Sequence, residues 1–234
     1  MKNIFVVAID GHAGCGKSSI SSKASKNMGW VYFSTGALYR GLGFLAEREN
    51  IDTNKHELLA SLLNKFNEHT SWNEISQSLY YKDEDLGPYL LNESIGTKAS
   101  DLAKKPIVRE KLLPLQRNLI KSFPGRVILV EGRDITTVVC PEAPLKIFMT
   151  ASIEERAKRR LDQLKENNPK ISISLQELME EISKRDHNDS SRELAPLFET
   201  KDSIHFDTGS MSFKECVRKL SELILSHKKE FDIK

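Results

Sequence analysis

The sequence has few of the features that mark secreted, membrane-bound or nucleic-acid-binding proteins. Its three cysteines (Cys15, Cys140 and Cys216) have no paired spacing and no histidine cluster nearby, which argues against a disulfide or zinc framework. No apolar run reaches membrane-spanning length, and the first residues show no signal-peptide pattern. The formal net charge is only +2, so no global field favours a nucleic acid or a membrane surface. We therefore expect a soluble, cytoplasmic protein that binds neither nucleic acid nor membrane.

Internal repeats and low-complexity linkers are also missing. A chain of 234 residues can bury a full core without disulfides or metals. We therefore expect one large domain, in which smaller subdomains can be inserted.

What the sequence does contain is a phosphate-binding loop directly behind an apolar run. Residues 4–10 form an apolar run rich in β-branched residues that ends in Asp10, and residues 11–18 (GHAGCGKS) follow the spacing Gly, four residues, Gly-Lys-Ser. Glycines let successive backbone N–H groups surround an anion, and the helix that follows presents its positive dipole end to the same anion. Lys17 can reach the outer phosphates of a nucleoside triphosphate, and the Ser18 hydroxyl can hold Mg²⁺. The loop predicts nucleoside triphosphate binding rather than an ordinary glycine-rich turn.

Alternating strand and helix signals continue along the chain. Further strands are expected over residues 30–33, 127–130, 145–149 and 204–207, and helices from residue 37 and over 55–66, 106–121, 152–168, 174–186 and 212–227. Residues 34–36 are expected to cap the helix that follows them, and Pro114 to kink or shorten its helix. Residues 78–81 and 88–91 suggest a short hairpin around a charged turn, and residues 187–192 suggest a loop.

This order predicts an α/β fold: a P-loop NTPase-type, five-stranded parallel sheet with helices on both faces. Ligands bind at the carboxyl ends of the strands in such sheets. Residues 11–18, 34–35, 131–134 and the loop after residue 186 should therefore converge.

Arginines recur in these segments. Arg40 follows the second strand, Arg133 ends the third, and Arg185 and Arg192 flank the late loop. Any one of them alone is most simply a surface residue, but planar guanidinium groups bind phosphate through paired hydrogen bonds. Together they suggest a second anion site facing the triphosphate, as in a kinase with a phosphorylated acceptor rather than a hydrolysing NTPase.

From the phosphate loop almost to its C-terminus, the chain resembles the bacterial cytidylate (CMP) kinases. The resemblance is carried by segments at residues 34–40 (STGALYR), 99–100, 108–110, 116–117, 131–134 (EGRD), 137–139, 143–148 (APLKIF), 154–157, 159–160, 185–186, 189–192 (DSSR) and 195–197. It implies phosphoryl transfer from ATP to CMP or dCMP with Mg²⁺ by a monomer, and a nucleoside monophosphate kinase fold. The implied division is a core of residues 1–51, 103–155 and 186–234, a monophosphate-binding insertion at about 52–102, and a lid at about 156–185.

The resemblance implies roles for matching residues. The groups expected at the transferred phosphoryl are Lys17, Arg133 and Arg192, and the metal ligand is Ser18. ATP is expected to contact Gly11, His12, Ala13, Gly14, Cys15, Gly16, Lys17, Ser18, Ser19 and the lid residue Arg159 or Arg160. CMP is expected to meet Arg40, Arg133 and Arg192 at its phosphate, Thr35, Ser100, Arg109 and Asp134 at cytosine, Arg185 and Asp189 at the ribose, and Tyr39.

Cytosine presents an amine donor and ring acceptors, which suit Asp134 as acceptor and Arg109 as donor. Uracil would set a carbonyl against Asp134, and such a mispaired group costs about 1–3 kcal/mol. Taken alone, Asp134 is equally well read as an exposed or salt-bridged carboxylate, and Ser100 as an ordinary surface serine.

The sequence departs from the usual pattern of these kinases at His12, Cys15, Ser34 and Thr136, and Glu131 stands where some relatives have aspartate but can still arrange water on Mg²⁺. A UMP/CMP, adenylate or dephospho-coenzyme A kinase remains an alternative, as does a regulatory nucleotide-binding module without a full catalytic set.

Overall fold

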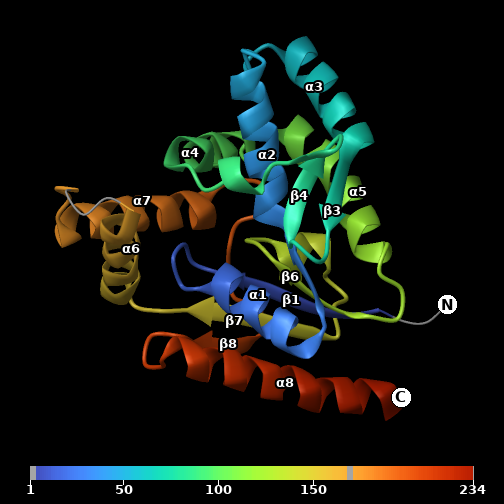
Figure 1. The fold of residues 1–234 in the computed structure, drawn as a ribbon, viewed down its shortest axis with the longest axis vertical. Helices are drawn as coiled ribbons and strands as arrows, with labels where there is room; N and C mark the ends of the chain where they lie inside the picture. The colour runs from blue at the N-terminus through green and yellow to red at the C-terminus, as the bar shows by residue number, and fades with distance from the viewer. Residues whose placement is uncertain (1–3, 168–170, 234) are drawn as a thin grey trace. The chain divides into compact units, whose positions relative to one another are not determined.

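The structure is a computed structural model that describes residues 4–167 and 171–233 (Figure 1). The chain divides into two compact units. The first unit comprises residues 1–4 and Val31–Val130, and the second comprises Phe5–Trp30 and Glu131–Lys234.

A five-stranded sheet carries the fold, in the order β2-β6-β1-β7-β8. Its strands are β1 (Phe5–Gly11), β2 (Val31–Ser34), β6 (Val127–Glu131), β7 (Leu145–Thr150) and β8 (Ile204–Asp207). β1 pairs in parallel with β7, and β7 with β8. The apolar residues of β1 and β6 are buried almost throughout, as parallel strands covered on both faces require. The predicted α/β fold with a five-stranded parallel sheet is confirmed.

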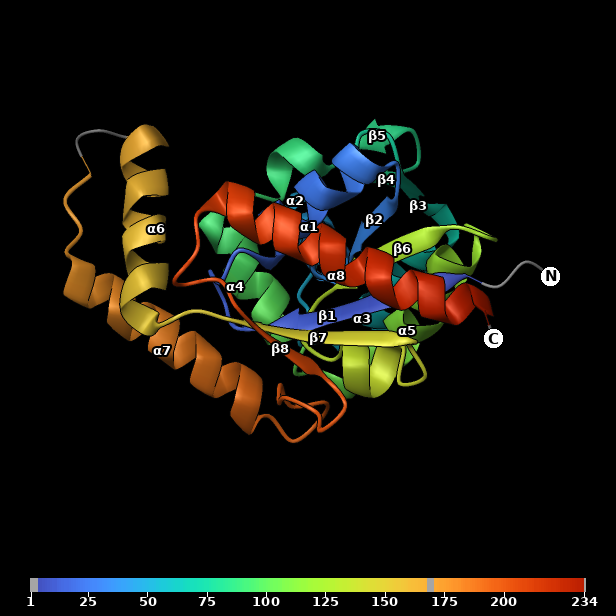
Figure 2. The same cartoon turned by 90° about the horizontal axis from the view of Figure 1, so that it is seen from below.

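In the second unit, helices surround the phosphate-loop strand. α1 (Lys17–Met28) follows β1, and η2 (Ile135–Val139) is a short π-helix after β6. α6 (Ile153–Asn167) and α7 (Leu175–Ser191) form a hairpin around Ala157, Leu178 and Ile182. α8 (Phe213–Ile233) packs along α1, as Figure 2 shows from below.

The first unit places helices beside a small antiparallel sheet. Its helices are α2 (Thr35–Arg48), α3 (His56–His69), η1 (Gly87–Tyr89), α4 (Glu93–Leu102) and α5 (Pro106–Lys121). The sheet has the order β3 (Thr70–Asn73), β4 (Ser78–Tyr81), β5 (Glu84–Asp85). The Trp72 indole donates to the Tyr32 carbonyl at 2.7 Å, which fixes β3 to the beginning of β2.

Several local predictions were wrong. Residues 88–91 form no strand, and Glu84–Asp85 pairs with β4 instead. The Asp85 carboxylate accepts a hydrogen bond from the Gly87 amide, and the chain turns there into η1, which takes up the start of the predicted strand. α2 begins at Thr35 with no side-chain cap from Ser34. α5 has the predicted bounds and runs on through Pro114 to Lys121, so the proline does not shorten it, while a kink at Pro114 stays a prediction. Residue 168, the last residue of the helix predicted over residues 152–168, lies outside the described residues.

The predicted loop over residues 187–192 is helical instead, since α7 extends to Ser191. The Ser190 hydroxyl donates to the Asp186 carbonyl at 2.9 Å, and the Ser191 hydroxyl donates to the His187 carbonyl at 2.6 Å. These hydroxyls, on residues that usually favour turns, therefore bond to carbonyls of their own helix. Arg185 and Asp189 consequently stand on a helix, and Arg192 caps its end.

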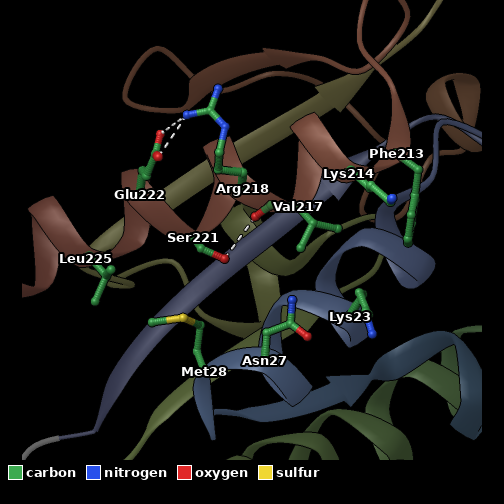
Figure 3. Close-up of a pocket in the computed structure, with 10 residues that line it drawn as sticks. All are labelled: Lys23, Asn27, Met28, Phe213, Lys214, Val217, Arg218, Ser221, Glu222 and Leu225. Atoms are coloured by element: carbon green, nitrogen blue, oxygen red, sulfur yellow. Dashed lines mark hydrogen bonds and ion pairs between the residues drawn. The ribbon is translucent and has the colours of Figure 1, made fainter.

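A groove with a volume of about 440 Å³ lies between α1 and α8 (Figure 3). Met28, Val217 and Leu225 contribute apolar surface to it, and Lys23 and Lys214 also line it. None of the predicted site residues lines this groove. Within residues 4–167 and 171–233, no helix has both the length and the apolar character needed to cross a membrane.

Candidate active site

The glycines of the phosphate loop occupy positions that a side chain would disturb. A Cβ on Gly11 would lie 2.1 Å from the Met149 carbonyl oxygen of the neighbouring strand β7. Gly16 has φ = 94° as the N-cap of α1, in the left-handed region that favours glycine. The close pairing of β1 with β7 and the sharp entry into α1 thus both depend on these glycines.

Lys17 is buried at the start of α1, and its Nζ donates to the His12 carbonyl at 3.0 Å. Burial lowers the pKa of Lys17, and the positive charge of Arg133 lowers it further. Lys17 therefore lies within electrostatic reach of Arg133, which follows β6. Burial also lowers the pKa of His12, whose ring packs edge-on against Phe148.

Ser18 and Glu131 bring two hard oxygen donors together. The Ser18 hydroxyl donates to Glu131 Oε1 at 3.1 Å, with Glu131 buried at the carboxyl end of β6. Mg²⁺ prefers such oxygens and usually completes its shell with water and substrate phosphates. Across the described ranges, no group of three or more His, Cys, Asp or Glu side chains is arranged to hold a metal by itself. The donor set fits a Mg²⁺ ion shared with a nucleotide.

The backbone of Ala13 is held by an ion pair between α6 and α7. Its amide donates to Asp186 Oδ1 at 3.2 Å, and its carbonyl accepts from Arg156 Nη1 at 3.0 Å. Arg156 Nη1 and Asp186 Oδ2 are themselves 2.5 Å apart. The loop is thus attached to both helices of the hairpin.

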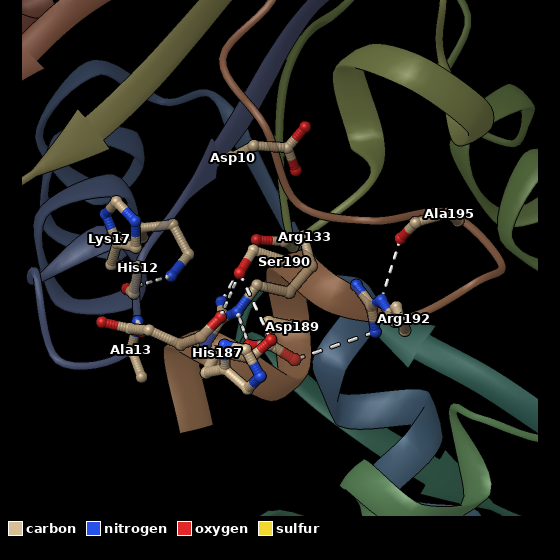
Figure 4. A network of polar contacts seen from close by, with 12 residues as sticks. Asp10, His12, Ala13, Lys17, Arg133, His187, Asp189, Ser190, Arg192 and Ala195 are labelled. Atoms are coloured by element: carbon tan, nitrogen blue, oxygen red, sulfur yellow. Dashed lines mark hydrogen bonds and ion pairs between the residues drawn. The ribbon is translucent and has the colours of Figure 1, made fainter. Parts of the chain in front are cut away.

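Asp189 lies between two of the predicted phosphate-binding arginines (Figure 4). Arg133 Nε donates to Asp189 Oδ2 at 2.7 Å, and Arg192 Nη1 lies 3.8 Å from Asp189 Oδ1. Burial alone would raise the pKa of Asp189, but Arg133, and after it Arg192 and Arg185, bring the pKa below its usual value. Burial likewise opposes the charge on Arg133, whose pKa is nevertheless raised by Asp189. The cluster therefore holds two permanent cations around one carboxylate.

Asp10 fixes the segment that follows Arg133 and Asp134. Its carboxylate accepts from the amides of Ile135 and Thr136 at 2.9 and 2.8 Å, and from the Thr136 hydroxyl at 2.6 Å. Burial raises the pKa of Asp10 despite these hydrogen bonds. Asp134 is buried and directly precedes η2. Because Asp10 of β1 binds the next two residues, it also fixes the backbone at Asp134.

Arg159 on α6 packs against the opposite flank of the loop. Its Nη2 donates to the Thr208 carbonyl at 2.6 Å, and its Nη1 to the Thr208 hydroxyl at 3.1 Å and the Cys15 carbonyl at 3.5 Å. The Thr208 hydroxyl also donates to the Cys15 carbonyl at 2.7 Å.

In the first unit, the predicted nucleotide-binding residues gather where α2, α4 and α5 meet. The Arg109 guanidinium lies 6.0 Å from the centre of the Tyr39 ring, and Arg109 Nε donates to the Ala103 carbonyl at 2.6 Å. Arg40 Nη1 donates to the Leu90 carbonyl at 2.9 Å and lies against Gly96 of α4. Thr35 is buried at the start of α2, and Ser100 is half-buried on α4, one turn after Gly96.

Comparison with known proteins identifies the family. The sequence pattern described as cytidylate kinase matches residues 7–226. The chain belongs to the cytidylate kinase family. The cytidylate kinase of Pseudomonas syringae is 40% identical over 224 residues, covering 94% of this chain and 95% of that protein. The cytidylate kinase of Caldicellulosiruptor saccharolyticus is 39% identical over 217 residues, covering 93% and 94%. The chain is therefore a kinase, a phosphotransferase acting on nucleoside monophosphates.

A solved structure of an uncharacterised protein from Eubacterium ventriosum shares the fold. It aligns with a TM-score of 0.53 at 11% identity, and the match covers 95% of this chain and 98% of that one. At this identity the likeness concerns the fold alone.

In this cytidylate kinase family member, the predicted residues are divided between the two units, and direct contacts join Arg133 and Arg192 to Asp189, and Arg109 to Tyr39. The second unit holds the phosphate loop with Ser19, Arg133, Asp134, Arg159, Arg185, Asp189 and Arg192, and the first unit holds Thr35, Tyr39, Arg40, Ser100 and Arg109. Sequence reasoning gave no role to Asp10, Arg156, Asp186 or Thr208, which support the loops. Asp10 directly precedes the phosphate loop, and Asp186 directly follows Arg185. Their position next to predicted site residues is the sequence feature that could have indicated these two supporting residues.

Proposed function

We propose that this kinase transfers the terminal phosphoryl group of ATP to CMP and dCMP, giving ADP and CDP or dCDP, with Mg²⁺. The observation that carries the proposal is the pair of guanidinium groups around Asp189, in the same unit as the phosphate loop, one of which, Arg133, acts electrostatically on Lys17. A phosphorylated acceptor needs such a second anion site, which simple hydrolysis does not. The names of the relatives agree with CMP as acceptor.

The family resemblance assigns Arg40, Arg133 and Arg192 to the acceptor phosphate in this proposal. The phosphate joins or replaces Asp189 as a partner of the two guanidinium groups, which Asp189 holds in place beforehand. Arg185 and Asp189 then contact the ribose. Prepositioned cations of this kind stabilise charge in the transition state without reorganising.

The family resemblance assigns the recognition of cytosine to Thr35, Ser100, Arg109 and Asp134. The Tyr39 ring supports the Arg109 guanidinium, which donates to the base acceptors. The Asp134 carboxylate accepts from the exocyclic amine, an interaction that uracil cannot make.

The triphosphate lies along the phosphate loop, with Lys17 at its outer phosphates and Arg159 beside the loop. The acceptor is already an anionic phosphate, so no side chain need remove a proton; positioning and charge neutralisation drive the transfer. When bound through Ser18 and Glu131, Mg²⁺ supplies charge neutralisation on the phosphate oxygens. Lys17, Arg133 and Arg192 orient the reacting groups and withdraw charge from the transferred phosphoryl.

The proposal includes a division of the chain into a core, a monophosphate-binding insertion at about residues 52–102, and a lid at about 156–185. Closure of the lid and the insertion would exclude water, which would otherwise hydrolyse ATP. We propose that the chain works as a monomer.

Acceptor screening tests the proposal. ADP release is measured with ATP and Mg²⁺ and with CMP, dCMP, UMP, AMP or dephospho-coenzyme A as acceptor. We expect CMP and dCMP to be turned over most efficiently, and replacing Mg²⁺ with EDTA to abolish turnover. Preference for another acceptor would overturn the proposed substrate, and ATP binding without any transfer would favour a regulatory module.

A further inference from the structure

The ion pair between Arg156 and Asp186 has no assigned part in binding either substrate. It is nevertheless one of the most enclosed charged contacts in the second unit, with side chains that are 6% and 16% exposed. Arg156 lies in the first turn of α6, and Asp186 lies near the end of α7. Arg156 is held further by a hydrogen bond from its Nε to the Ala151 carbonyl at 3.0 Å.

The pair holds the phosphate loop from both sides of one residue. The Ala13 amide donates to Asp186, and the Ala13 carbonyl accepts from Arg156. The two side chains also bind each other and thereby fix each other's position. Ala13 therefore cannot shift without breaking its backbone hydrogen bonds to these charged groups. A Cβ on Gly14 would lie 3.5 Å from the Arg156 Cβ, so the next loop residue also packs on this arginine.

We propose that Arg156 and Asp186 are positioning residues for the phosphoryl donor. They set the backbone of Ala13 and Gly14, and thereby aim the N–H groups that follow toward the triphosphate. The same contacts make the base of the α6–α7 hairpin part of the donor site. The proposal rests on the proposed function only in taking ATP as the ligand.

A positioning role and a purely structural role predict different ATP affinities for a variant in which both charges are removed. Breaking a buried ion pair at one partner leaves an uncompensated charge, whereas removing both charges restores much of the stability. If the pair serves only folding, ATP affinity returns together with stability. If it positions the loop, stability returns and ATP affinity does not.

The experiment compares Asp186→Asn, Arg156→Lys and the double variant Arg156→Gln/Asp186→Asn. An Asn side chain carries no charge and has one acceptor oxygen in place of the two that separately bind Ala13 and Arg156. A lysine cannot donate to both partners in the geometry of a guanidinium. Glu154→Gln is the matched control, since it breaks an exposed ion pair with Lys158 on the same helix. Calorimetry with ATP and no acceptor gives donor affinity, thermal unfolding gives stability, and steady-state kinetics give the KM for CMP.

We expect Asp186→Asn and Arg156→Lys to weaken ATP binding about tenfold or more while the KM for CMP stays within about twofold. The double variant should unfold at a higher temperature than Asp186→Asn yet bind ATP as weakly, and Glu154→Gln should match the unmodified protein.

Recovery of ATP affinity in the double variant, or equal losses for ATP and CMP, would overturn the proposal. Tighter ATP binding by Asp186→Asn would also overturn it, because the carboxylate would then be competing with the triphosphate. If Asp186→Asn does not fold, Arg156→Lys, which keeps the charge, and the double variant decide the question. Donor affinity is measured without acceptor, so failure to phosphorylate CMP would count against the proposed function and not against this pair.

Discussion

Replacement of Arg133 by alanine removes one of the two guanidinium groups around Asp189. The side chain is 19% exposed, and its Nε lies 2.7 Å from the Asp189 carboxylate. A hydrogen bond to a charged group contributes about 1.5–3 kcal/mol, and a guanidinium binds phosphate through two of them. The variant should therefore lose about 3–6 kcal/mol of transition-state stabilisation, or roughly 10²- to 10⁴-fold in kcat/KM for CMP. ATP affinity should stay nearly unchanged, because the phosphate loop and Lys17 remain.

The assay is ADP release at varied CMP and saturating ATP, together with calorimetric ATP binding in the absence of CMP. Arg218→Ala is the control, since this arginine of α8 is 58% exposed and pairs only with Glu222 among the ion pairs described. An equal loss of ATP and CMP affinity in Arg133→Ala would refute the assignment of Arg133 to the acceptor. The kcat/KM of Arg133→Lys for CMP should lie between those of Arg133→Ala and the unmodified protein, because lysine keeps the charge but not the paired hydrogen bonds.

Three further outcomes are expected. Asp134→Ala should erode the preference for CMP over UMP by roughly ten- to hundredfold in the ratio of kcat/KM values; an unchanged ratio would remove Asp134 from base recognition. The pKa of Asp189 is lowered on folding from its usual 3.8, so its stabilising contribution is fully present above that pH and is lost as the pH falls through the folded pKa. The difference in Tm between Asp189→Asn and the unmodified protein should accordingly shrink in acid, and a difference independent of pH would contradict this account. Thr136→Val should lower the free energy of unfolding by about 1–3 kcal/mol in urea titration, because Asp10 loses a buried donor. Thr137→Val is the matched control, as the Thr137 hydroxyl has no hydrogen-bond partner in the described part of the chain; equal losses in the two variants would argue against the Asp10 contact.

The sequence predicts the parts of the fold whose signals are local. The phosphate loop, α5 and β8 appear where periodicity and spacing place them, because glycine spacing, helical apolar spacing and β-branched runs each specify one conformation. Residues 187–191 were misread because asparagine, aspartate and serine favour turns, whereas their side chains here bond back to the helix. Residues 84–91 were misread because the strand has only two residues and a side chain sets the turn after it.

The residues of the candidate site could be named from motifs, but their supports could not. Asp186 lies 173 residues from Ala13, and Asp10 lies 126 residues from Thr136, so only the folded chain reveals these contacts. The partners of the predicted arginines were hidden for the same reason. Nothing in the sequence indicates that Asp189 lies between Arg133 and Arg192.

The close approach of Gly11 to Met149 affects how substitutions at this glycine should be interpreted. The two residues face each other in the β1–β7 register, so any side chain at position 11 would push apart adjoining strands of the central sheet. A Gly11→Ala variant would therefore report on the integrity of the scaffold rather than on nucleotide affinity. Lys17 and Ser18 lie on α1, outside the paired residues of β1 and β7, so they are the positions at which ligand binding can be altered while the strands stay joined.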